Sequence, residues 1–397
     1  MPKTTSTARF ADRVFDLSEP GVRNAVRDDP DGVLATAPTG TVLIDEWQEA
    51  PEILGAVKRI VDRDSTVRPG RFIITGSVRA AHQAQTWPGT GRLIRVRMFG
   101  LTQAELALQH TYNPIDAFFS PEAPNYGPSD VSRGDYLDRL IAGRFPAVLH
   151  LKGRNRSRWF HSYIEQLIDR DAQQVADRRI RPAKLRAVFG SSVARTAQEL
   201  NKNRTAEDAG VDYRSADFYM QLLEDLSVVM RIPAWDTKRL KRLTQTPKVH
   251  VTDAGMAAHE LRIDAAGLTS DATLVGQLVE TFVAAELAAH LETCADDTAI
   301  FHFRNRDGKE VDLVLERNNR VTAIEVKSAT SVDRSDAQGL IWMRDKIGAS
   351  FHLGIVLYTG TLPYQLDDRI WALPISTLWE PPIGQHTAQS PTRSSRP

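Results

Sequence analysis

The order of apolar and polar residues predicts an α/β region at the start of the chain. Apolar runs over Val14–Leu17, Thr41–Ile44 and Arg71–Thr75 have the length of short buried strands. Residues 56–61 carry apolar side chains at helical spacing between the last two runs, and Lys3–Arg13 can also form a helix. Alternating strands and helices are typical of a sheet covered by helices.

The pattern divides the rest of the chain into further regions. Residues 1–106 form the first predicted domain, and residues 107–134, rich in Pro, Gly, Asn and Ser, are predicted to be a connecting loop. Helical periodicity dominates residues 135–265. Residues 270–380 begin with an amphipathic helix and continue into strands, and the polar tail 381–397 is predicted to be disordered. The strands expected in the last domain are Ile300–Phe303, Val311–Leu315, Val321–Val326 and Gly354–Tyr358.

Composition adds constraints on the environment of the protein. Hydrophobic residues make up 42% of the 397 residues, and 50 basic side chains balance 50 acidic ones. No overall field therefore favours nucleic acid or a membrane. The single cysteine, Cys294, excludes an internal disulfide and fits a reducing cytoplasm. No signal peptide is visible, and the apolar stretch Leu274–Leu291 contains too many polar residues to span a bilayer. We expect a cytoplasmic protein without a membrane partner.

A nucleotide site is predicted at the ends of the first strands. The run Thr41–Ile44 ends in Asp45 and Glu46, as a Walker B strand does. Asp45 would hold Mg²⁺ and Glu46 would polarise the attacking water. The next strand ends in Thr75-Gly-Ser77, whose hydroxyls can sense a γ-phosphate, and Arg92 could stabilise phosphoryl charge. The structural alternatives are a strand that runs into a polar loop and, for Arg92, a solvated surface arginine.

These residues carry a family resemblance. The runs L-I-D-E-W-Q-E-A-P and P-G-R-F-I-I-T-G-S resemble a large prokaryotic group of AAA-type ATP-binding proteins that carry a C-terminal domain of unknown function. The resemblance implies ATP and Mg²⁺ as cofactors. It matches Lys3 to the phosphate-binding lysine and Thr4 to the hydroxyl on the Mg²⁺ side. Pro2 stands where the family has a glycine, and the chain contains no G-x-x-x-x-G-K-[ST] loop.

The departure from the family pattern leads to a specific expectation. The chain is expected to be truncated through the Walker A loop, to lack the first strand of the domain, and to bind ATP poorly or not at all as written. Two explanations stay open: a true start further upstream, or a decayed copy of the gene. Intact Walker B and sensor residues favour the upstream start.

The middle region predicts a winged-helix module. A helix, a turn at Gly210 and a second helix span residues 205–226, and a strand over residues 228–235 follows as a wing. Acidic residues on the second helix would repel phosphate, so the module could hold either DNA or another protein. The basic residues at or after the wing are Arg231, Lys238, Arg239, Lys241, Arg242 and Lys248.

A second candidate site lies in the C-terminal region. Asp312, Glu325 and Lys327 form a D-x12-E-x-K pattern across two successive strands, and Glu280 on the preceding helix could add a carboxylate. The arrangement resembles the PD-(D/E)xK nuclease fold, in which Asp312 and Glu325 would be metal ligands for Mg²⁺ and Lys327 would stabilise charge at a phosphate. The alternatives are an amphipathic hairpin with exposed charges and a nuclease fold kept as a binding platform.

The leading interpretation is therefore an α/β protein of three parts. These are an incomplete P-loop NTPase (AAA-like) domain, a helical winged-helix module and an α/β restriction-endonuclease-like domain. The expected activity is ATP hydrolysis, and a homo-oligomer is plausible because AAA-type sites often work between subunits. Two other hypotheses are a Mg²⁺-dependent nuclease with a regulatory N-terminal half, and a non-catalytic regulatory or DNA-binding protein with vestigial sites.

Overall fold

The structure is a computed structural model, and it divides the chain into two compact units. Unit 1 comprises the described parts of residues 1–98 and 170–179, and unit 2 those of residues 99–169 and 180–397. The described residues are 7–37, 39–63, 70–76, 92–109, 111–176, 180–243 and 245–384.

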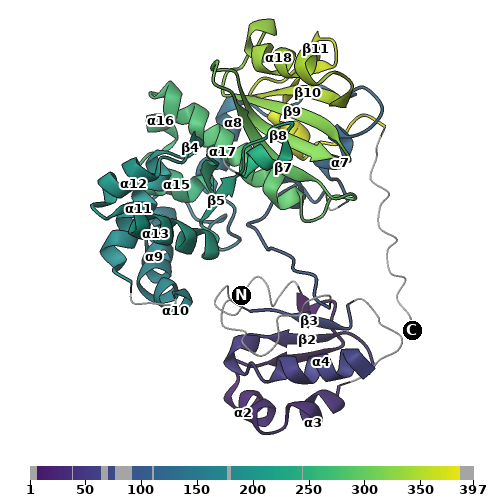
Figure 1. The fold of residues 1–397 in the computed structure, drawn as a ribbon, viewed down its shortest axis with the longest axis vertical. Helices are drawn as coiled ribbons and strands as arrows, with labels where there is room; N and C mark the ends of the chain where they lie inside the picture. Colours follow the sequence, from purple (N-terminus) through teal and green to yellow (C-terminus); the bar gives the residue numbers. More distant parts are fainter. Residues whose placement is uncertain are drawn as a thin grey trace. The chain divides into compact units, whose positions relative to one another are not determined.

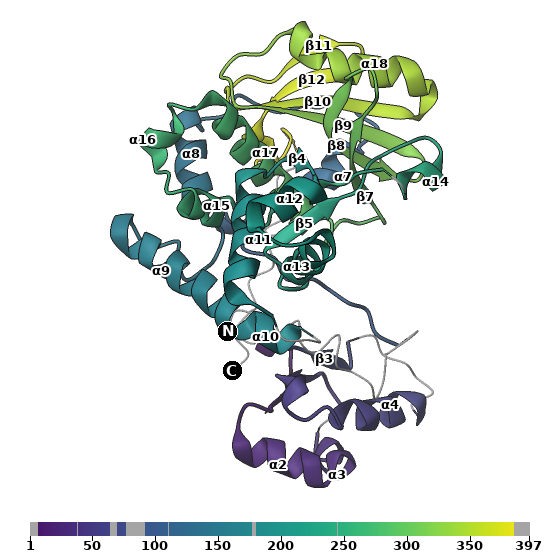
Figure 2. The same cartoon turned by 60° about the vertical axis from the view of Figure 1, so that its left-hand side comes forward.

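Unit 1 is built on a parallel three-stranded sheet in the order β1-β2-β3. The three predicted strands are confirmed, and helices α2, α3 and α4 lie on one side of the sheet (Figures 1 and 2). Apolar side chains from the strands and these helices form one core, which explains the apolar spacing of residues 56–61. The elements are β1 (Arg13–Asp16), α2 (Pro20–Asp28), α3 (Pro30–Ala35), β2 (Val42–Asp45), η1 (Trp47–Glu49), α4 (Ile53–Arg63) and β3 (Phe72–Ile74).

The helix predicted over Lys3–Arg13 does not extend to Arg13. Residues 1–6 lie outside the described residues, and Arg9 and Phe10 form a turn. The amides of Asp12 and Arg13 both donate to the carbonyl of Thr41, at 2.8 and 3.3 Å. Arg13 thereby enters the sheet beside Val42, because pairing with the buried strand β2 competes with the local helical preference.

The first half of unit 2 consists largely of helices. A short antiparallel sheet in the order β4-β6-β5 lies among them. The predicted helix–turn–helix is present: α12 ends at Gly210, whose φ of 58° is in the left-handed region that favours glycine. The elements are α6 (Gln103–Leu106), α7 (Pro114–Phe118), α8 (Arg133–Ala142), α9 (Gly153–Gln166), α11 (Pro182–Ala194), β4 (Gln198–Glu199), α12 (Lys202–Ala209), α13 (Tyr213–Asp225), β5 (Val229–Ile232), α14 (Arg239–Arg242), β6 (Lys248–Val251), α15 (Ala254–Glu260) and α16 (Ala265–Leu268). Between α9 and α11, η2 (Leu167–Asp171) runs from unit 2 into the part of the chain that belongs to unit 1, and α10 (Ala172–Val175) lies within that part.

A six-stranded mixed sheet forms the second half of unit 2. Its order is β11-β12-β10-β9-β8-β7, with α18 on one face and α17 with α7 on the other (Figure 2). The four strands predicted from sequence are β7 to β10. The elements are α17 (Ala272–His290), β7 (Ala299–Arg304), β8 (Glu310–Arg317), β9 (Arg320–Lys327), η3 (Arg334–Ala337), α18 (Gln338–Ile347), η4 (Gly348–Ser350), β10 (Phe351–Tyr358), β11 (Tyr364–Asp367), β12 (Ile370–Pro374) and η5 (Ile375–Leu378).

The hairpin that carries the second candidate site forms as predicted. Strands β8 and β9 pair antiparallel, and Arg317 lies opposite Arg320. The two residues between them, Asn318 and Asn319, have φ of 49° and 64°. Positive φ at both positions is the requirement of a two-residue type I′ turn, and asparagine tolerates it. This turn fixes the register that brings the two strands' carboxylates together.

The segment predicted as a connecting loop, 107–134, is instead part of the core of unit 2. It contains α7, and Phe118 is 1% exposed. The Tyr112 hydroxyl donates to the carbonyl of Thr377 at 2.6 Å, and Asp116 pairs with Arg317 at 2.6 Å. Proline and glycine content indicated a loop correctly in part, but it carries no information on the aromatic side chains that pack under the sheet.

Residues 99–106, the end of the first predicted domain, lie in unit 2 of the structure. The backbone carbonyls of Gly100 and Leu101 accept hydrogen bonds from the Arg144 side chain, at 3.2 and 3.1 Å. Arg144 pairs with Glu286 at 3.2 Å, and both side chains are almost fully buried. Glu286 also accepts from the amide of Gln103 at 2.9 Å. This buried ion pair holds residues 100–103 on unit 2.

One helix among the described residues, α17, is long and apolar enough to cross a membrane by length and composition alone, which corrects the expectation that Leu274–Leu291 is too polar for this. Of its most apolar window, 56% is buried inside the protein. Ala284, Ala285 and Leu287 are among the buried residues. This burial is typical of a core helix, on which the sheet and the neighbouring helices pack.

A glycine substitution tests the close approach of α18 to the sheet. A Cβ at Gly339 would lie 2.1 Å from the carbonyl oxygen of Glu310, so helix and strand must separate. We expect Gly339→Ala to lower the free energy of unfolding of unit 2 by about 1–3 kcal/mol, measured by urea unfolding of the full chain. The matched control is Gly276→Ala in α17, where nothing lies within 4 Å of the new Cβ. Equal destabilisation by both variants would contradict the prediction.

Candidate functional site

The first candidate site lies at the carboxyl end of the sheet in unit 1. Asp45 ends β2 and is 4% exposed. The amide of Thr75 continues the ladder of β3 by donating to the carbonyl of Ile44 at 2.9 Å. The Thr75 hydroxyl donates to a carboxylate oxygen of Asp45. The two strand ends therefore bring a carboxylate and a hydroxyl into contact, as the sequence pattern predicts.

Glu46 leaves the strand in a left-handed backbone conformation, with φ of 50°. A non-glycine residue pays for this conformation, and such residues concentrate at functional sites. The side chain of Glu46 is half-buried, and its Oε2 accepts a hydrogen bond from Nε2 of the Gln48 side chain. Gln48 belongs to the D-E-x-Q run, so this glutamine orients the second carboxylate, a role that the sequence analysis did not assign.

Gly76 explains the glycine of the Thr-Gly-Ser run. A Cβ on Gly76 would lie 2.5 Å from Oε1 of Gln48 and 2.9 Å from the Trp47 ring. The backbone after β3 can therefore approach the Asp-Glu turn closely only because residue 76 has no side chain. This contact places the ends of the two strands against each other.

The remaining residues predicted for this site fall into two groups. Arg92 forms a 2.6 Å ion pair with Asp62 of α4, on the surface of unit 1. Lys3, Thr4 and Ser77 lie outside the described residues. The structure thus brings together Asp45, Glu46 and Thr75 of the predicted set.

The second candidate site, in unit 2, is organised by a lysine from the middle region. Lys248 begins β6 and is 2% exposed. Its ammonium lies 2.8 Å from Oε1 of Glu280, 3.2 Å from Oδ1 of Asp312 and 3.2 Å from Oε1 of Glu310. The two carboxylates that the sequence predicted from α17 and β8 thus meet on an amine that was assigned to the wing.

Asp312 is directed by an irregularity in its strand. Between the pairs Phe303↔Val311 and Phe301↔Val314, β8 advances by three residues while β7 advances by two. Such a β-bulge re-aims side chains and is common beside functional sites. The second oxygen of Asp312 accepts from the amide of Val326 at 2.9 Å. Asp312 is therefore fixed by both neighbouring elements.

Glu325 and Lys327 share one face of β9, as their spacing predicts. The Lys327 ammonium donates to Oε1 of Glu325 at 2.8 Å, while Oε2 of Glu325 is buried without a hydrogen-bond partner. Burial, and then the nearby Asp312 carboxylate, raise the pKa of Glu325 to about 8. The same two causes raise the pKa of Glu280 well above its usual value.

Neutral polar side chains stand behind the carboxylates. His250 is fully buried, and its Nε2, which has no hydrogen-bond partner, lies 3.8 Å from Oε1 of Glu280. Burial and the charge of Lys248 hold the pKa of His250 well below its usual value, so the ring is neutral. Its other nitrogen faces the Thr281 hydroxyl at 3.3 Å. The positive charge beside Glu280 therefore comes from Lys248.

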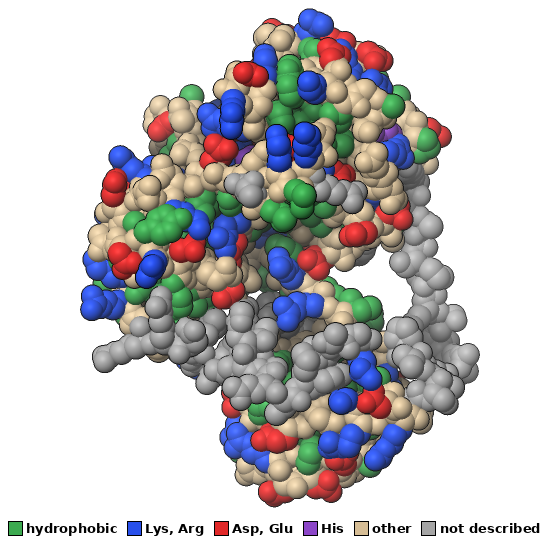
Figure 3. Space-filling model, viewed as in Figure 1, with side chains coloured by type: hydrophobic (Ala, Val, Ile, Leu, Met, Phe, Trp, Pro, Cys, Tyr) green, Lys and Arg blue, Asp and Glu red, His purple; other side chains and the backbone are tan. Residues whose placement is uncertain are grey.

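Three of the six basic residues predicted around the wing form ion pairs within unit 2. Arg242 makes a bidentate contact with Glu316 of β8, at 3.1 and 2.7 Å. Arg231 pairs with Glu224, and Lys248 is buried among carboxylates. On the face shown in Figure 3, basic side chains are interspersed with acidic ones over both units. The spacing of these residues in the sequence did not show that Arg242 and Lys248 have acidic partners far along the chain.

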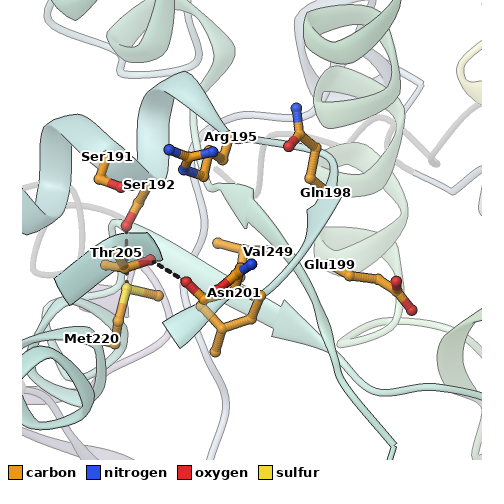
Figure 4. Close-up of a pocket in the computed structure, with 10 residues that line it drawn as sticks. Ser191, Ser192, Arg195, Gln198, Glu199, Asn201, Thr205, Met220 and Val249 are labelled. Atoms are coloured by element: carbon orange, nitrogen blue, oxygen red, sulfur yellow. Dashed lines mark hydrogen bonds between the residues drawn. The ribbon is translucent and has the colours of Figure 1, made fainter. Parts of the chain in front are cut away.

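Two concave features accompany the second site. A groove of about 1060 Å³ is lined by residues that include Thr246, Pro247 and Glu310, so it opens beside the Lys248 carboxylates. Among its lining cations, Arg195 and Arg304 pair with Asp208 and Glu199 at 2.6 and 3.4 Å. A separate cavity of about 10 Å³ lies between α11, α12 and β6 (Figure 4). It is no larger than a single water.

Glu310 was not among the residues predicted for this site, and Lys248 was predicted only as one of the basic residues around the wing. The signal was available for Lys248, because Lys248-Val-His-Val opens a short strand between apolar positions. A lysine in a buried strand needs carboxylate partners. The sequence did not show which carboxylates these are, because Glu280 and Asp312 are 32 and 64 residues away.

Comparisons with known proteins match each of three parts of the chain to a domain family. Residues 3–107 match the AAA domain family, residues 133–267 match a domain of unknown function (DUF8612), and residues 275–378 match a domain of unknown function (DUF4143). The chain therefore carries an AAA domain followed by a C-terminal domain of unknown function, which confirms the coarser part of the resemblance. An AAA domain indicates nucleotide binding.

Particular relatives are themselves uncharacterized. Uncharacterized protein Rv2008c of Mycobacterium tuberculosis is 26% identical over 343 residues, which are 85% of this chain and 68% of the relative. Uncharacterized protein Mb2031c of Mycobacterium bovis matches to the same extent. A solved structure, protein VC1899 from Vibrio cholerae, aligns over 94% of this chain and 96% of its own. Its identity is 10% and its TM-score 0.21, so it supports no comparison of folds.

The pKa of Glu325 generates a pH prediction. A carboxyl whose pKa is raised by folding stabilises the protein fully below its ordinary value of 4.5, and the contribution is lost as pH rises through about 8. We expect the wild-type chain to lose stability relative to Glu325→Gln between about pH 5 and about pH 8.5. Thermal unfolding of both proteins across this range measures the difference, from which the other titrating groups cancel.

The control for this prediction is Glu122→Gln, an exposed carboxylate of unit 2. Its difference from the wild type should be nearly independent of pH over the same range. A flat difference profile for Glu325→Gln would show that Glu325 does not titrate with a raised pKa.

Proposed function

We propose that unit 1 carries an AAA-type ATPase site that works with Mg²⁺. In this site Asp45 is the carboxylate ligand of the metal, and Glu46 activates the attacking water. The observation that carries the proposal is the contact between Thr75 and Asp45 at the ends of adjacent parallel strands. The AAA domain match over residues 3–107 supports it.

The donor set fits this assignment. A hard cation such as Mg²⁺ prefers carboxylate and hydroxyl oxygens, which are the groups that end β2 and β3. When bound with ATP, Mg²⁺ would neutralise charge on the phosphates. Asp45 is held by Thr75, and Glu46 is held by Gln48, so each carboxylate has a fixed orientation before any ligand arrives. Preorganised acceptors of this kind lower the cost of reaching the transition state.

The phosphate-binding part of the site stays a proposal from the resemblance. Lys3 and Thr4 would contact the phosphates, and Ser77 and Arg92 would act as sensor and phosphoryl-charge partner. In the described part of unit 1, Arg92 is bound to Asp62. Its role would require that this exposed ion pair, which contributes little to stability, exchanges for a phosphate.

We propose a winged-helix arrangement for the middle of the chain. The order α11, β4, α12, α13, β5, β6 with the antiparallel sheet β4-β6-β5 supports this proposal. The wing lies on the C-terminal sheet: the amide of Trp235 donates to the carbonyl of His302 at 2.6 Å. This contact favours a protein-binding use of the wing over DNA contact, with the C-terminal sheet as the protein surface that it holds.

The ATPase proposal ranks above the nuclease alternative for a physical reason. A metal-dependent nuclease needs carboxylate oxygens that converge on a cation. In unit 2 the oxygens of Glu280, Glu310 and Asp312 converge on the Lys248 ammonium instead.

Replacing Glu46 tests the ATPase proposal. We expect Glu46→Gln to lower the rate of Mg²⁺-dependent ATP hydrolysis by about 100-fold or more while nucleotide binding is kept, because a general base is lost without loss of volume. Steady-state phosphate release and titration with a fluorescent ATP analogue measure the two quantities. Both are measured with the 397-residue chain and with a version that carries the residues encoded immediately upstream.

The matched control is Glu49→Gln, the same chemical change three residues away. Glu49 is half-buried, and its Oε2 lies 3.8 Å from Nη1 of Arg23. We expect it to hydrolyse ATP at the wild-type rate. If Glu46→Gln and Glu49→Gln turn over ATP equally fast, Glu46 is not the catalytic base; if neither version of the chain binds ATP, the proposal for unit 1 is wrong.

A further inference from the structure

The nuclease-like pattern of unit 2 implies a divalent metal on Asp312 and Glu325, and the positions of the carboxylate oxygens test this implication. Oδ1 of Asp312 faces the Lys248 ammonium at 3.2 Å, and Oδ2 accepts the Val326 amide at 2.9 Å. Oε1 of Glu325 accepts from Lys327, so that Oε2 of Glu325, which is buried without a hydrogen-bond partner, is the one oxygen of these two carboxylates that is not engaged. In the part of the chain that the structure describes, no three His, Cys, Asp or Glu side chains are arranged to hold a metal ion. The residues do not fit the metal.

We propose that the carboxylates of Glu280, Glu310 and Asp312 are a receptor for the Lys248 ammonium, which takes the place of a metal ion and fastens the middle module to the C-terminal sheet. The proposal is independent of ATP hydrolysis in unit 1. It assigns Glu280 and Asp312, two of the four nuclease-like residues, to a structural latch.

The stoichiometry of donors and acceptors fits an ammonium. Lysine has three N–H donors and no acceptor. Three carboxylates, one from α17 and two from β8, lie at 2.8, 3.2 and 3.2 Å from Nζ, which are distances of N–H···O contacts. Metal–oxygen distances are shorter, about 2.0–2.6 Å for Mg²⁺ and Ca²⁺. The Lys248 ammonium donates hydrogen bonds to Glu280 and Asp312, and it forms an ion pair with Glu310.

Because the ion pairs of Lys248 are buried, removal of one partner should strongly destabilise the protein. Lys248 is 2% exposed, and the side chains of Glu280 and Asp312 are 12% exposed each. Loss of one partner from a buried ion pair leaves a charge without compensation and is strongly destabilising. Glu310, at 38% exposed, is the member that faces the groove. The ammonium is therefore held from the interior and shielded from solvent.

An unsatisfied atom beside the cluster is a second, independent observation. Nε2 of His250 is fully buried, has no hydrogen-bond partner and lies 3.8 Å from Oε1 of Glu280. His250 and Lys248 both belong to β6, but the hydrogen bond to Glu280 comes from Lys248. The cation that this cluster of carboxylates binds is therefore the Lys248 ammonium of β6.

The segment from Pro233 to Lys248 also contacts the C-terminal sheet at the end opposite Lys248. Nε1 of Trp235 donates to Glu316 at 2.6 Å, and Arg242 holds the same carboxylate. The amide of His302 donates to the carbonyl of Pro233 at 3.0 Å. The segment from Pro233 to Lys248 therefore has an anchor on β7 and β8 at each end. This agrees with the placement of both modules in one compact unit.

Amide hydrogen exchange in residues 245–251 and in β8 tests the proposed latch. We expect Lys248→Met, which keeps the length of the side chain and removes its charge, to raise amide exchange in residues 245–251 and in β8 by at least about tenfold. The control is Lys238→Met, an exposed lysine of the same segment, which should leave exchange unchanged. Unchanged exchange in Lys248→Met would overturn the proposal.

A double variant keeps the test decisive if Lys248→Met destabilises unit 2 severely. Lys248→Met leaves buried carboxylates unpaired, whereas Lys248→Met combined with Glu280→Gln removes one of those charges. We expect the double variant to unfold at a higher temperature than Lys248→Met alone. A double variant that is as unstable as the sum of its two single variants would show that the residues do not act as a pair.

Metal titration separates the latch from a metal centre. Mn²⁺ is added to the full chain and to Asp312→Asn, and bound metal is measured by electron paramagnetic resonance. We expect the same number of bound Mn²⁺ ions in both proteins, since any site at Asp45 is common to them. Loss of one Mn²⁺ per chain in Asp312→Asn, or a metal-dependent DNA cleavage that this variant abolishes, would overturn the proposal.

Discussion

The buried ammonium of Lys248 is the interaction on which the organisation of unit 2 depends. Removal of a charge from water costs several kcal/mol per ion, so this lysine must meet carboxylates wherever it is buried. Those carboxylates come from α17 and β8, and the lysine comes from β6. One ion cluster therefore requires that three elements far apart in sequence meet. Burial, and then the neighbouring Asp312 carboxylate, raise the pKa values of Glu280 and Glu325 at this cluster.

The two candidate sites show different ways to build a polar cluster. The site in unit 1 is local in design: parallel strands deliver Asp45 and Thr75 to the same edge because both strands end there. Its second carboxylate follows directly in the sequence. The site in unit 2 is assembled by contacts across the fold, with a β-bulge that directs Asp312 and a helix that supplies Glu280. The first arrangement suits a ligand that binds at a sheet edge, and the second suits an internal joint.

Sequence patterns predicted the elements well where one rule governed them. The strands of the C-terminal hairpin alternate regularly, and Asn318-Asn319 is a turn signal with a known conformational reason. The pattern was less informative for residues 107–134, where proline and glycine suggested a loop. The burial of Phe118 and the ion pair of Asp116 with Arg317 depend on partners about 200 residues away, which local composition does not describe.

The sequence by itself determined the strands, the pairing of Asp45 with a hydroxyl-bearing strand, and the shared face of Glu325 and Lys327. These features follow from periods of two residues and from the order of strand, turn and strand, which are local properties of the chain. Only the tertiary structure decided what the acidic residues of unit 2 bind. Ion pairs form between residues that packing brings within about 4 Å, and Lys248 reaches Glu280 and Asp312 only after the middle module has docked on the C-terminal sheet.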